Sequence, residues 1–408
     1  MHKNKGGRHY WFADNLAKNG YNPVIFCSNQ FHETTDQIDL ENKKYKIDGS
    51  GKFPFVFVKS SPYKGNGISR IFNMFSFYKN LLSITKNYVK QHEKPDVILA
   101  SSVHPLTLVA GIKIAKRYKI PCICEMRDLW PEAIFEYGAL KKNSLIGKIL
   151  RLGEKWIYKR ANALIFTKEG DTDYLKERKW DSAQGGAINL NKCHYINNGV
   201  DLEAFDYNKE YYITNDDDLE NDDVFKVIYT GAIRKVNNLR IIVEVAKELK
   251  DNDEVKFLIW GNGDELEELK MYVKQENLKN ISFKGYVEKK YIPYILSKSS
   301  VNMLHYQYTP ILRFGTSENK IFDYLASGKP VLRTMKTNYD FITESNSGKS
   351  IEEQTIDNIK NAVLDFYKMA YEQKELYNEM CINARKTAEE YDFKLLTKKL
   401  IEIIEEQQ

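Results

Sequence analysis

Short apolar segments alternate with helical patterns along this chain, and the alternation decides which folds are open to it. Apolar runs of strand length recur through the first 200 residues, at 23–28, 53–59, 97–100, 122–126, 163–167 and 194–197. Helical patterns separate them, at 10–19, 69–91, 106–118, 145–159 and 170–179. Alternating strands and helices predict a parallel sheet covered by helices, so the first half is expected to form a doubly wound α/β domain.

A second array of the same kind begins at Val224. Its strand-like runs and helical patterns lie at 225–230, 239–250, 256–260, 266–276, 281–284, 291–297, 301–304, 317–326 and 331–333. Two successive arrays predict an α/β protein with two Rossmann-like, doubly wound domains that face each other across a cleft. The expected divisions are an N-terminal domain (1–205), an acidic linker (206–223), a second domain (224–385) and an amphipathic C-terminal helix (386–408).

Two acidic motifs could be mistaken for metal sites. Asp216, Asp217 and Asp218 lie in the polar linker, where a mobile, hydrated acidic loop is the favoured interpretation. Asp171 and Asp173 form an Asp-x-Asp pair, but the pair lies at a helix start and not in a loop after a strand of the second domain. We therefore expect no bound metal.

The composition indicates a soluble globular protein. Of the 408 residues, 42% are hydrophobic and 29% are charged, and no apolar run reaches the roughly 18 residues that a membrane span needs. The five cysteines are scattered, which favours reduced thiols in a cytoplasmic protein. Residues 1–200 carry a net charge of +14, whereas residues 201–408 carry −9. The basic half is expected to meet an anionic partner, such as a phospholipid surface, a lipid diphosphate or a nucleic acid.

The segment 314–331 has the pattern of a short helix with a polar entrance. Small and polar residues open it, an apolar helical run follows, and Gly328 stands where a helix C-cap glycine belongs. Ser317 or Thr316 is expected to cap the N-terminus of this helix.

This entrance also has the chemistry of an anion site. The free N–H groups of a helix N-terminus, with Asn319 and Lys320 beside them, would attract a nucleotide diphosphate. Asp323 lies one turn into the helix, where it could accept hydrogen bonds from a ribose diol. An ordinary capped αβ unit is the alternative on local chemistry alone.

The same segment resembles the donor-binding signature of family 4 glycosyltransferases, which are retaining enzymes of the GT-B fold. Asp323 stands at the second acidic position of that signature and is followed by Tyr-Leu-Ala-Ser-Gly-Lys-Pro-Val, whereas Gly315 occupies the first acidic position. Ser317-Glu318-Asn319-Lys320 is close to the Ser-Pro-Asn-Lys of relatives that resemble bacterial capsule and O-antigen transferases. The segment 195–205 resembles the crossing between two GT-B domains, so the resemblance covers nearly the whole chain.

Members of this family begin with a strand that precedes a Gly-Gly turn, and here only five residues precede Gly6 and Gly7. The sequence is therefore expected to start late, and loss of a central strand would leave the edges of its neighbours unpaired. The two glycines let backbone approach a phosphate or a sugar, and the resemblance implies that their loop faces the donor.

Further donor contacts are expected in the loops that end the strands of the second domain. Arg234 and Lys235 follow its first strand, where cations would neutralise a departing diphosphate. The resemblance implies a catalytic role for both, and a surface Arg-Lys pair is the alternative. It also implies that Gly231 and Gly261 border the donor and that the backbone at Val287 reads the base.

Polar residues also end two strands of the first domain. His104 follows one strand, where a lone histidine is more often structural, but the resemblance implies a catalytic contact with the transferred sugar. Glu125, Arg127 and Asp128 close the next strand, and such charges are costly to bury unless they pair. They are expected to form a polar floor for the acceptor, with an Arg127–Asp128 pair as the alternative.

Two basic helical regions of the first domain, 69–91 and 141–160, carry apolar and aromatic residues among their lysines. This pattern is typical of docking at a membrane interface, and a core helix with a hydrated lysine stripe explains it equally well. On the first interpretation the protein attaches peripherally to the inner face of the plasma membrane.

Together these features predict a retaining glycosyltransferase. It would move a sugar, expected to be an N-acetylated or deoxyamino hexose, from a UDP-linked donor to a lipid-linked saccharide in cell-surface polysaccharide synthesis. We expect neither a metal nor another cofactor, and no nucleic-acid partner because no recognised binding motif accompanies the basic half. The alternatives are a nucleotide-sugar 2-epimerase of the same architecture and a degenerate, non-catalytic nucleotide-sugar binding protein.

Overall fold

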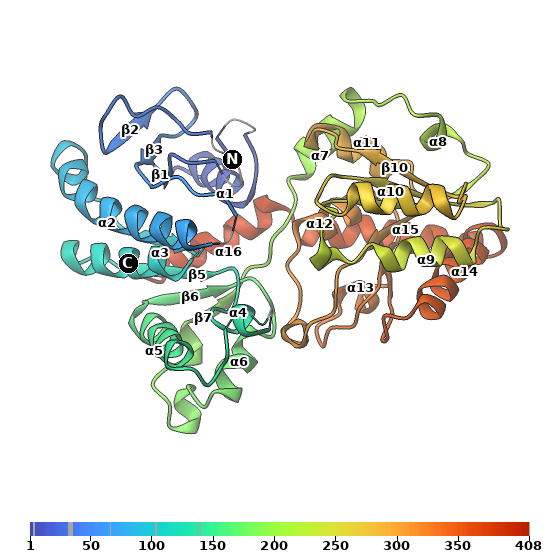
Figure 1. Cartoon of the computed structure of the whole chain (residues 1–408). Helices are drawn as coiled ribbons and strands as arrows, with labels where there is room; N and C mark the ends of the chain where they lie inside the picture. The colour runs from blue at the N-terminus through green and yellow to red at the C-terminus, as the bar shows by residue number, and fades with distance from the viewer. Residues whose placement is uncertain are drawn as a thin grey trace. The chain divides into compact units, whose positions relative to one another are not determined.

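A computed structural model describes the chain over residues 1–2, 5–31, 36–65, 67–102, 104–136, 138 and 140–407. It divides the chain into two compact units. Unit 1 comprises Met1–Asn197 and Phe393–Gln408, and unit 2 comprises Asn198–Asp392. In each unit parallel strands alternate with helices, so the predicted α/β fold with two doubly wound domains is confirmed (Figure 1).

The chain leaves unit 1 after Asn197 and returns at Phe393, whereas the sequence predicted divisions at 205 and 386. Hydrogen bonds explain the difference, because they hold the residues after Asn197 to unit 2. The Asn198 side chain donates to the Ser317 carbonyl, and the Val200 N–H donates to the Tyr391 carbonyl at 3.1 Å.

The sheet of unit 2 places its strands in the order β10-β9-β8-β11-β12-β13, and every neighbouring pair is parallel. The strands are β8 (Phe225–Thr230), β9 (Val255–Trp260), β10 (Ile281–Gly285), β11 (Val301–Leu304), β12 (Val331–Arg333) and β13 (Gly348–Ser350). In chain order this is 3-2-1-4-5-6, the order of dinucleotide-binding folds. The strand order reverses between β8 and β11, which is where ligands bind in such sheets.

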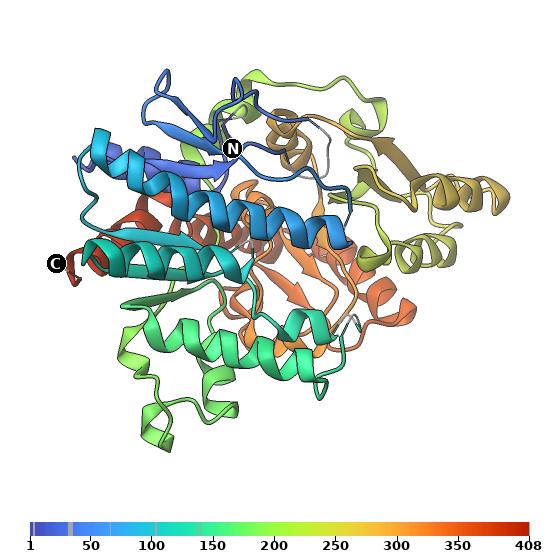
Figure 2. The same ribbon diagram turned by 60° about the vertical axis from the view of Figure 1, so that its left-hand side comes forward.

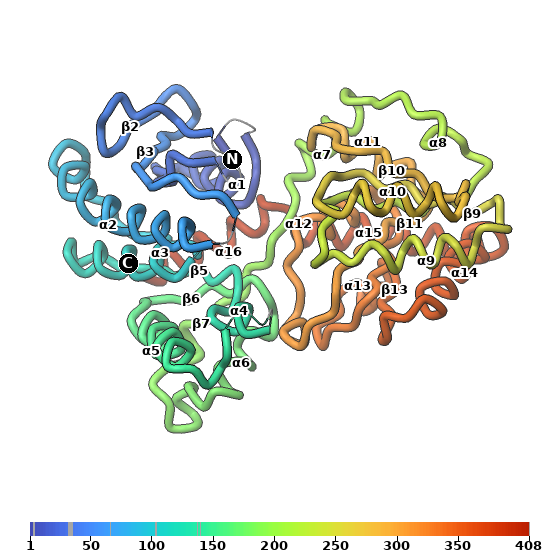
Figure 3. The backbone as a smooth tube through the Cα atoms, viewed as in Figure 1, coloured from blue at the N-terminus to red at the C-terminus, as the bar shows by residue number. Residues whose placement is uncertain are grey.

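Helices cover both faces of this sheet because alternate strand residues point to opposite sides. Val227 and Tyr229 join a core with α9, α10 and α14, whereas Ile228 and Leu258 join a core with α7, α11, α12 and α15. Figure 3 shows α9 and α10 side by side along the strands. The helices are α7 (Leu202–Tyr211), α9 (Arg240–Glu248), α10 (Leu266–Gln275), α11 (Ile292–Ser297), α12 (Asn319–Ala326), α13 (Phe341–Glu344), α14 (Ile356–Glu372) and α15 (Lys374–Glu390).

The acidic stretch 206–223 is folded onto unit 2, so its prediction as a mobile linker is wrong. Lys284 of β10 lies with its Nζ atom 2.7 Å from a carboxylate oxygen of Asp216 and 2.7 Å from one of Asp218. Burial would raise the pKa of Asp218, but hydrogen bonds from Lys256 and Lys284 together hold it at about 2. The lysine partner lies far along the sequence, which is why local composition alone suggested a solvated loop.

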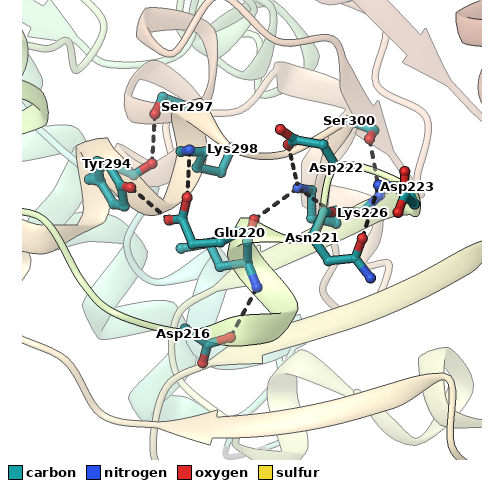
Figure 4. A network of polar contacts seen from close by, with 11 residues as sticks. Asp216, Glu220, Asn221, Asp222, Asp223, Lys226, Tyr294, Ser297, Lys298 and Ser300 are labelled. Atoms are coloured by element: carbon teal, nitrogen blue, oxygen red, sulfur yellow. Dashed lines mark hydrogen bonds and ion pairs between the residues drawn. The ribbon is translucent and has the colours of Figure 1, made fainter.

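Figure 4 shows the network that continues this attachment around α8 (Asp217–Glu220). Glu220 accepts hydrogen bonds from the Tyr294 hydroxyl at 2.6 Å and from Lys298 at 2.7 Å. The buried Lys226 ammonium donates to two backbone carbonyls of the same stretch. Among the described residues, no group of His, Cys, Asp and Glu side chains is arranged to hold a metal ion.

The strands of unit 1 form two sheets, with orders β1-β3-β2 and β4-β5-β6-β7. Strands β1 (Ile25–Ser28), β3 (Phe55–Val58), β4 (Ile98–Ser101), β5 (Cys122–Met126), β6 (Ala163–Phe166) and β7 (Cys193–Tyr195) fall where the sequence predicted strands. The pattern missed β2 (Tyr45–Asp48), which pairs antiparallel with β3 and has no buried residue. A short, half-exposed edge strand lacks the apolar run by which the others were recognised.

The predicted return of the C-terminal helix to the first domain is confirmed by α16 (Phe393–Glu405), which packs beside α1 (Arg8–Lys18). The rings of Phe393 and Phe12 meet edge to face, 5.5 Å apart. On the other side of unit 1, α3 lies between α2 and α5 (Figure 2). The remaining helices are α2 (Ile68–Gln91), α3 (Pro105–Tyr118), α4 (Glu132–Glu136), α5 (Leu145–Arg160) and α6 (Asp171–Glu177).

A buried glutamic acid joins α5 to α6. Glu154 accepts hydrogen bonds from the Tyr158 hydroxyl at 2.9 Å and from the Tyr174 hydroxyl at 2.7 Å. Burial raises the pKa of Glu154 to about 8, so the folded protein keeps this carboxyl protonated at neutral pH.

This raised pKa gives the first prediction. Because Glu154 has a higher pKa in the folded than in the unfolded chain, its stabilising effect is complete below pH 4.5 and is lost as the pH rises toward 8. Glu154→Gln, which copies the neutral carboxyl, should flatten the pH dependence of unfolding over this range by up to about 1.4 kcal/mol per pH unit. Urea denaturation at several pH values measures it. The exposed control Glu93→Gln should keep the wild-type slope, and an unchanged slope in Glu154→Gln would contradict the assignment.

Candidate functional site in unit 2

Three glycine-containing loops meet at the carboxyl ends of β8, β9 and β10. The Gly231 N–H donates to the Trp260 carbonyl at 2.9 Å, and the Gly261 N–H donates to the Gly285 carbonyl at 2.8 Å. Gly231 and Gly261 both have φ of 152°, and a Cβ atom on Gly261 would overlap the Gly231 carbonyl. Glycine is therefore required here, because only a residue without a Cβ atom lets the two loops approach so closely.

Lys320 reaches this glycine turn from the first turn of α12. Its Nζ atom lies 3.1 Å from the Tyr229 hydroxyl and 4.4 Å from the centre of the Tyr229 ring. A Cβ atom on Gly231 would collide with Nζ, so the ammonium lies directly against the turn. Across the part of the chain that the structure describes, no carboxylate forms an ion pair with Lys320.

The environment makes this cation unusual. Burial lowers the pKa of Lys320 to about 8, and the nearby carboxylate of Glu318 opposes that shift. A withdrawn ammonium without a carboxylate partner is costly, and groups with a strongly shifted pKa cluster at functional sites. Lys320 therefore forms a pre-positioned cation at the point where the strand order reverses.

A second contact fixes α12 against β8, so that Lys320 cannot swing freely. The buried Tyr324 hydroxyl accepts from the Thr230 N–H at 3.0 Å and donates to the Thr230 carbonyl at 3.1 Å. Residues 320 and 324 are one helical turn apart and face the same strand. Gly328 has φ of 67° and ends α12, as predicted.

The predicted cap of this helix is wrong. The N-cap residue is Glu318, not Ser317 or Thr316, and its side chain makes no capping hydrogen bond. The two predicted residues serve other groups, because the Thr316 hydroxyl accepts from Arg333 at 3.4 Å and the Ser317 carbonyl accepts from Asn198.

Arg234 and Lys235 lie in the loop after β8, as predicted, and both side chains are exposed. Their loop is anchored from beneath by His305, which is fully buried just after β11. His305 Nε2 lies 3.1 Å from the Asn238 carbonyl and Nδ1 lies 2.6 Å from the Thr334 hydroxyl. A carbonyl only accepts, so Nε2 carries the proton and Nδ1 accepts from Thr334.

The other donor-side residues occupy the same edge of the sheet. Asp323 lies 3.5 Å from the exposed Lys289 ammonium, which follows β10. Val287 is partly buried in the same loop and packs against the core beneath α11 and α12. Asn319 begins α12 with an exposed side chain.

In unit 1, some predicted residues are fully hydrogen-bonded within the protein, and others keep side-chain atoms available for a ligand. Glu125 is fully buried, with one oxygen 2.8 Å from Arg8 Nε and the other accepting from Ser101 and His9. These partners hold the pKa of Glu125 well below its usual range although burial alone would raise it. Because both its oxygens are engaged within the protein, Glu125 is part of the scaffold and does not form an open acceptor floor.

Arg127 and Asp128 behave differently from Glu125. Arg127 Nε is buried without a hydrogen-bond partner among the described residues, and Asp128 is exposed. No ion pair joins these two side chains, so the proposed Arg127–Asp128 pair is wrong.

The predicted glycine turn of unit 1 leads into α1. Gly7 is the N-cap residue of this helix, with φ of 96°, and directly follows Gly6.

His104 immediately precedes α3 and is buried. Burial, aided by Arg70, lowers its pKa to about 4, so the ring is neutral at physiological pH. Its Nδ1 atom has no hydrogen-bond partner within the described part of the chain. A neutral ring with one unused nitrogen fits a hydrogen-bonding role toward a ligand better than a charged one.

Sequence reasoning missed four residues that shape these edges: Arg8, Tyr229, His305 and Arg333. Arg8 opens α1, and the other three lie in the last two residues of a strand or directly after one. Arg8, Tyr229 and Arg333 contact the predicted residues Glu125, Lys320 and Thr316, respectively. His305 contacts the loop that carries Arg234 and Lys235. The rule that ligands gather at the carboxyl ends of parallel strands would have flagged His305 and Arg333.

Two family models match the chain over nearly its whole length. Residues 10–204 match the model described as Glycosyltransferase Family 4, and residues 214–387 match the model described as Glycosyl transferases group 1. The chain belongs to the family 4 glycosyltransferases. The prediction of this family from the segment 314–331 is therefore confirmed, and the chain is a glycosyltransferase.

Solved structures agree in fold with this family 4 assignment. Sucrose-phosphate synthase from Thermosynechococcus elongatus has a TM-score of 0.71 at 15% identity, over 98% of this chain and 93% of its own. HepE from Anabaena, solved with UDP and glucose, has a TM-score of 0.63 at 13% identity, over 98% of this chain and 96% of its own. WaaG, a glycosyltransferase involved in lipopolysaccharide biosynthesis, has a TM-score of 0.61 at 13% identity, over 97% of this chain and 95% of its own. The predicted GT-B architecture is confirmed, and no curated protein matches the sequence.

The anchoring role of His305 gives the second prediction. His305→Ala leaves the Asn238 carbonyl without its donor, so the free energy of unfolding should fall by about 1–3 kcal/mol at pH 7.5. Burial lowers the folded-state pKa of His305 from 6.5 to about 4, so wild-type stability is lost as the pH falls between these values. The variant should show a smaller loss over that range in chemical denaturation, and an identical loss would contradict the buried neutral ring.

Proposed function

We propose that the chain transfers a sugar from a UDP-linked donor to a lipid-linked saccharide, with retention of configuration at the sugar. The observation that carries this proposal is Lys320, a withdrawn ammonium at the point where the strand order reverses, which pairs with no carboxylate among the described residues. Such a cation suits the diphosphate of a nucleotide sugar, because its charge grows as the sugar departs. The UDP bound to HepE, a protein of the same fold, supports this choice of ligand.

The residues around Lys320 are assigned complementary roles. Arg234 and Lys235 would add positive charge to the leaving diphosphate from the loop after β8, which supplies by side chains what metal ions supply in other transferases. Asp323 would accept hydrogen bonds from the ribose. The Gly231, Gly261 and Val287 loops would line the nucleotide with backbone, and the N–H groups at the start of α12, near Ser317 and Asn319, would face a phosphate.

In unit 1 we assign sugar and acceptor contacts to groups with unused hydrogen-bonding capacity. The neutral His104 ring would orient the transferred sugar, and Gly6 and Gly7 would let it approach the backbone. Arg127 and Asp128 would meet the acceptor. The transferred group is proposed to be an N-acetylated or deoxyamino hexose, and no dedicated general base is assigned.

This proposal gives the third prediction. Lys320→Met should weaken binding of UDP-glucose or UDP-N-acetylglucosamine about 10- to 100-fold, the usual value of a hydrogen bond to a charged group. The unliganded variant should be at least as stable as wild type, because an unpaired, withdrawn charge has been removed. Calorimetric titration and thermal unfolding measure the two effects.

The matched control is Lys279→Met. Lys279 is exposed, makes no ion pair among the described contacts and lies before β10, at the amino end of the same sheet. The Lys279→Met variant should bind the nucleotide sugars as tightly as wild type does. If Lys320→Met binds as tightly as Lys279→Met, the diphosphate site is elsewhere and the proposed function loses its main support.

Exposed apolar side chains support a membrane-linked acceptor. Within the described chain, the first turns of α2 and α5 each expose a stripe of large apolar residues, in which every side chain is more than half exposed. The stripes consist of Ile68, Ile71, Phe72, Phe75, Leu145, Ile146, Ile149 and Leu152. Both helices continue with exposed lysines, which favours anionic lipid headgroups beside the apolar stripe.

These apolar stripes lie on the side of unit 1 where its strands have their carboxyl ends, which is also where the proposed sugar and acceptor residues lie. Helices α2, α3 and α5 each begin after the carboxyl end of a strand, which is where His104 and Arg127 also lie. No helix within the described residues is long and apolar enough to cross a bilayer. We therefore propose peripheral attachment to a cytoplasmic membrane face, and the fold shared with WaaG supports a place in cell-surface polysaccharide synthesis.

The fourth prediction follows from this attachment. Replacing Ile71, Phe72 and Phe75 together with serine should weaken binding to phosphatidylglycerol vesicles at least about tenfold, since each inserted side chain contributes on the order of 1 kcal/mol or more. Vesicle co-sedimentation measures it. Serine at Met271 and Ile382, exposed apolar residues of unit 2, should change nothing, and equal losses in both variants would contradict the assignment.

A further inference from the structure

Two opposite charges lie near each other at the start of α12 and do not pair. The Lys320 ammonium senses the negative charge of Glu318, because that carboxylate raises its pKa against the effect of burial. Within the described chain, however, no ion pair joins them, and the polar partner of Lys320 is the Tyr229 hydroxyl. Opposite charges withdrawn from water normally close onto each other, so the separation itself requires an explanation.

Glu318 has no structural role that accounts for its position. It is the N-cap residue of α12, but its side chain accepts no hydrogen bond from the helix. Its Oε2 atom is buried and has no hydrogen-bond partner among the described residues. Buried polar atoms are nearly always hydrogen-bonded in native proteins, and an exception calls for a missing partner.

Such a missing partner must satisfy both groups. Lys320 has ammonium protons to offer to an anion, and Glu318 can only accept when it is ionised. A sugar esterified to a diphosphate, the donor of the proposed reaction, presents an anion and hydrogen-bond donors within a few bonds of each other. Its phosphate would meet Lys320, and a hydroxyl or amide N–H of its sugar ring would meet Glu318.

We infer that Glu318 accepts a hydrogen bond from the transferred sugar and thereby selects donors that carry a free hydroxyl or amide N–H at this point. The inference rests on the proposed function, since it takes the donor diphosphate to lie on Lys320. A carboxylate here also disfavours donors that place their own negative charge against it.

Binding of UDP and of the matching UDP-sugar separates this role from the binding of the diphosphate. The measured quantity is the ratio of the two dissociation constants, because any effect of Glu318 on Lys320 and the diphosphate cancels in the ratio. UDP-glucose and UDP-N-acetylglucosamine are titrated into the full-length wild type, Glu318→Gln and the control Glu344→Gln. Glu344 is an exposed glutamate of α13 in the same unit.

The sugar should tighten binding to the wild type and to Glu344→Gln by the same factor. In Glu318→Gln this factor should shrink about 10-fold or more, since a hydrogen bond to a charged acceptor is lost or weakened. The variant keeps the shape of the side chain, and its thermal unfolding should match wild type, so misfolding is distinguishable from lost recognition.

Other outcomes overturn the inference. If Glu318→Gln weakens UDP and the UDP-sugar equally, Glu318 only adjusts the charge of Lys320. If the wild type binds the UDP-sugar no more tightly than UDP, no sugar contact of this kind exists, although the proposed diphosphate site stands. If the wild type binds neither ligand, the proposed function fails and the inference fails with it.

Discussion

The site depends on the Lys320 ammonium, which lies against the Tyr229 ring and the Gly231 turn. Among the residues that the structure describes, no carboxylate pairs with it. A folded protein pays for such an arrangement in stability, because a withdrawn charge loses its hydration. The same loss of hydration lowers the pKa of Lys320. Because no carboxylate within the described chain pairs with this charge, we interpret Lys320 as a cation placed to bind an anionic ligand.

The surrounding fold keeps this cation in place. Tyr324 ties α12 to the end of β8, His305 ties the Arg234 loop to the end of β11, and Arg333 contacts the residues that enter α12. All three side chains are fully buried, so packing fixes their orientation as well as their hydrogen bonds. The charged residues of the site are therefore placed by neutral or internally satisfied neighbours, which leaves the charge of Lys320 available.

The sequence predicted those features whose causes are local. Strands such as β5 and β8 were placed correctly because their apolar runs have the length of a buried strand, and the end of α12 was placed by Gly328. Predictions from the sequence were wrong where a feature depends on a residue that is distant along the chain. The acidic stretch 206–223 was read as a mobile linker because its partner Lys284 lies on β10, and Ser317 was read as a cap because its link to Asn198 is invisible locally. In the same way the sequence assigned no role to the Glu318 side chain, since only the structure shows that its buried Oε2 atom has no hydrogen-bond partner among the described residues.

The pH dependence of UDP-sugar binding tests the central claim most directly. Between pH 7 and 8.5 the diphosphate of a UDP-sugar stays fully ionised and its uracil keeps its imide proton, so a change in affinity over that range reports on the protein. If Lys320 receives the diphosphate, affinity should fall as the pH rises above about 8, and calorimetry near pH 8 should show uptake of a proton on binding that Lys320→Met abolishes. Affinity that is constant from pH 7 to 8.5, with no proton uptake, would contradict the account.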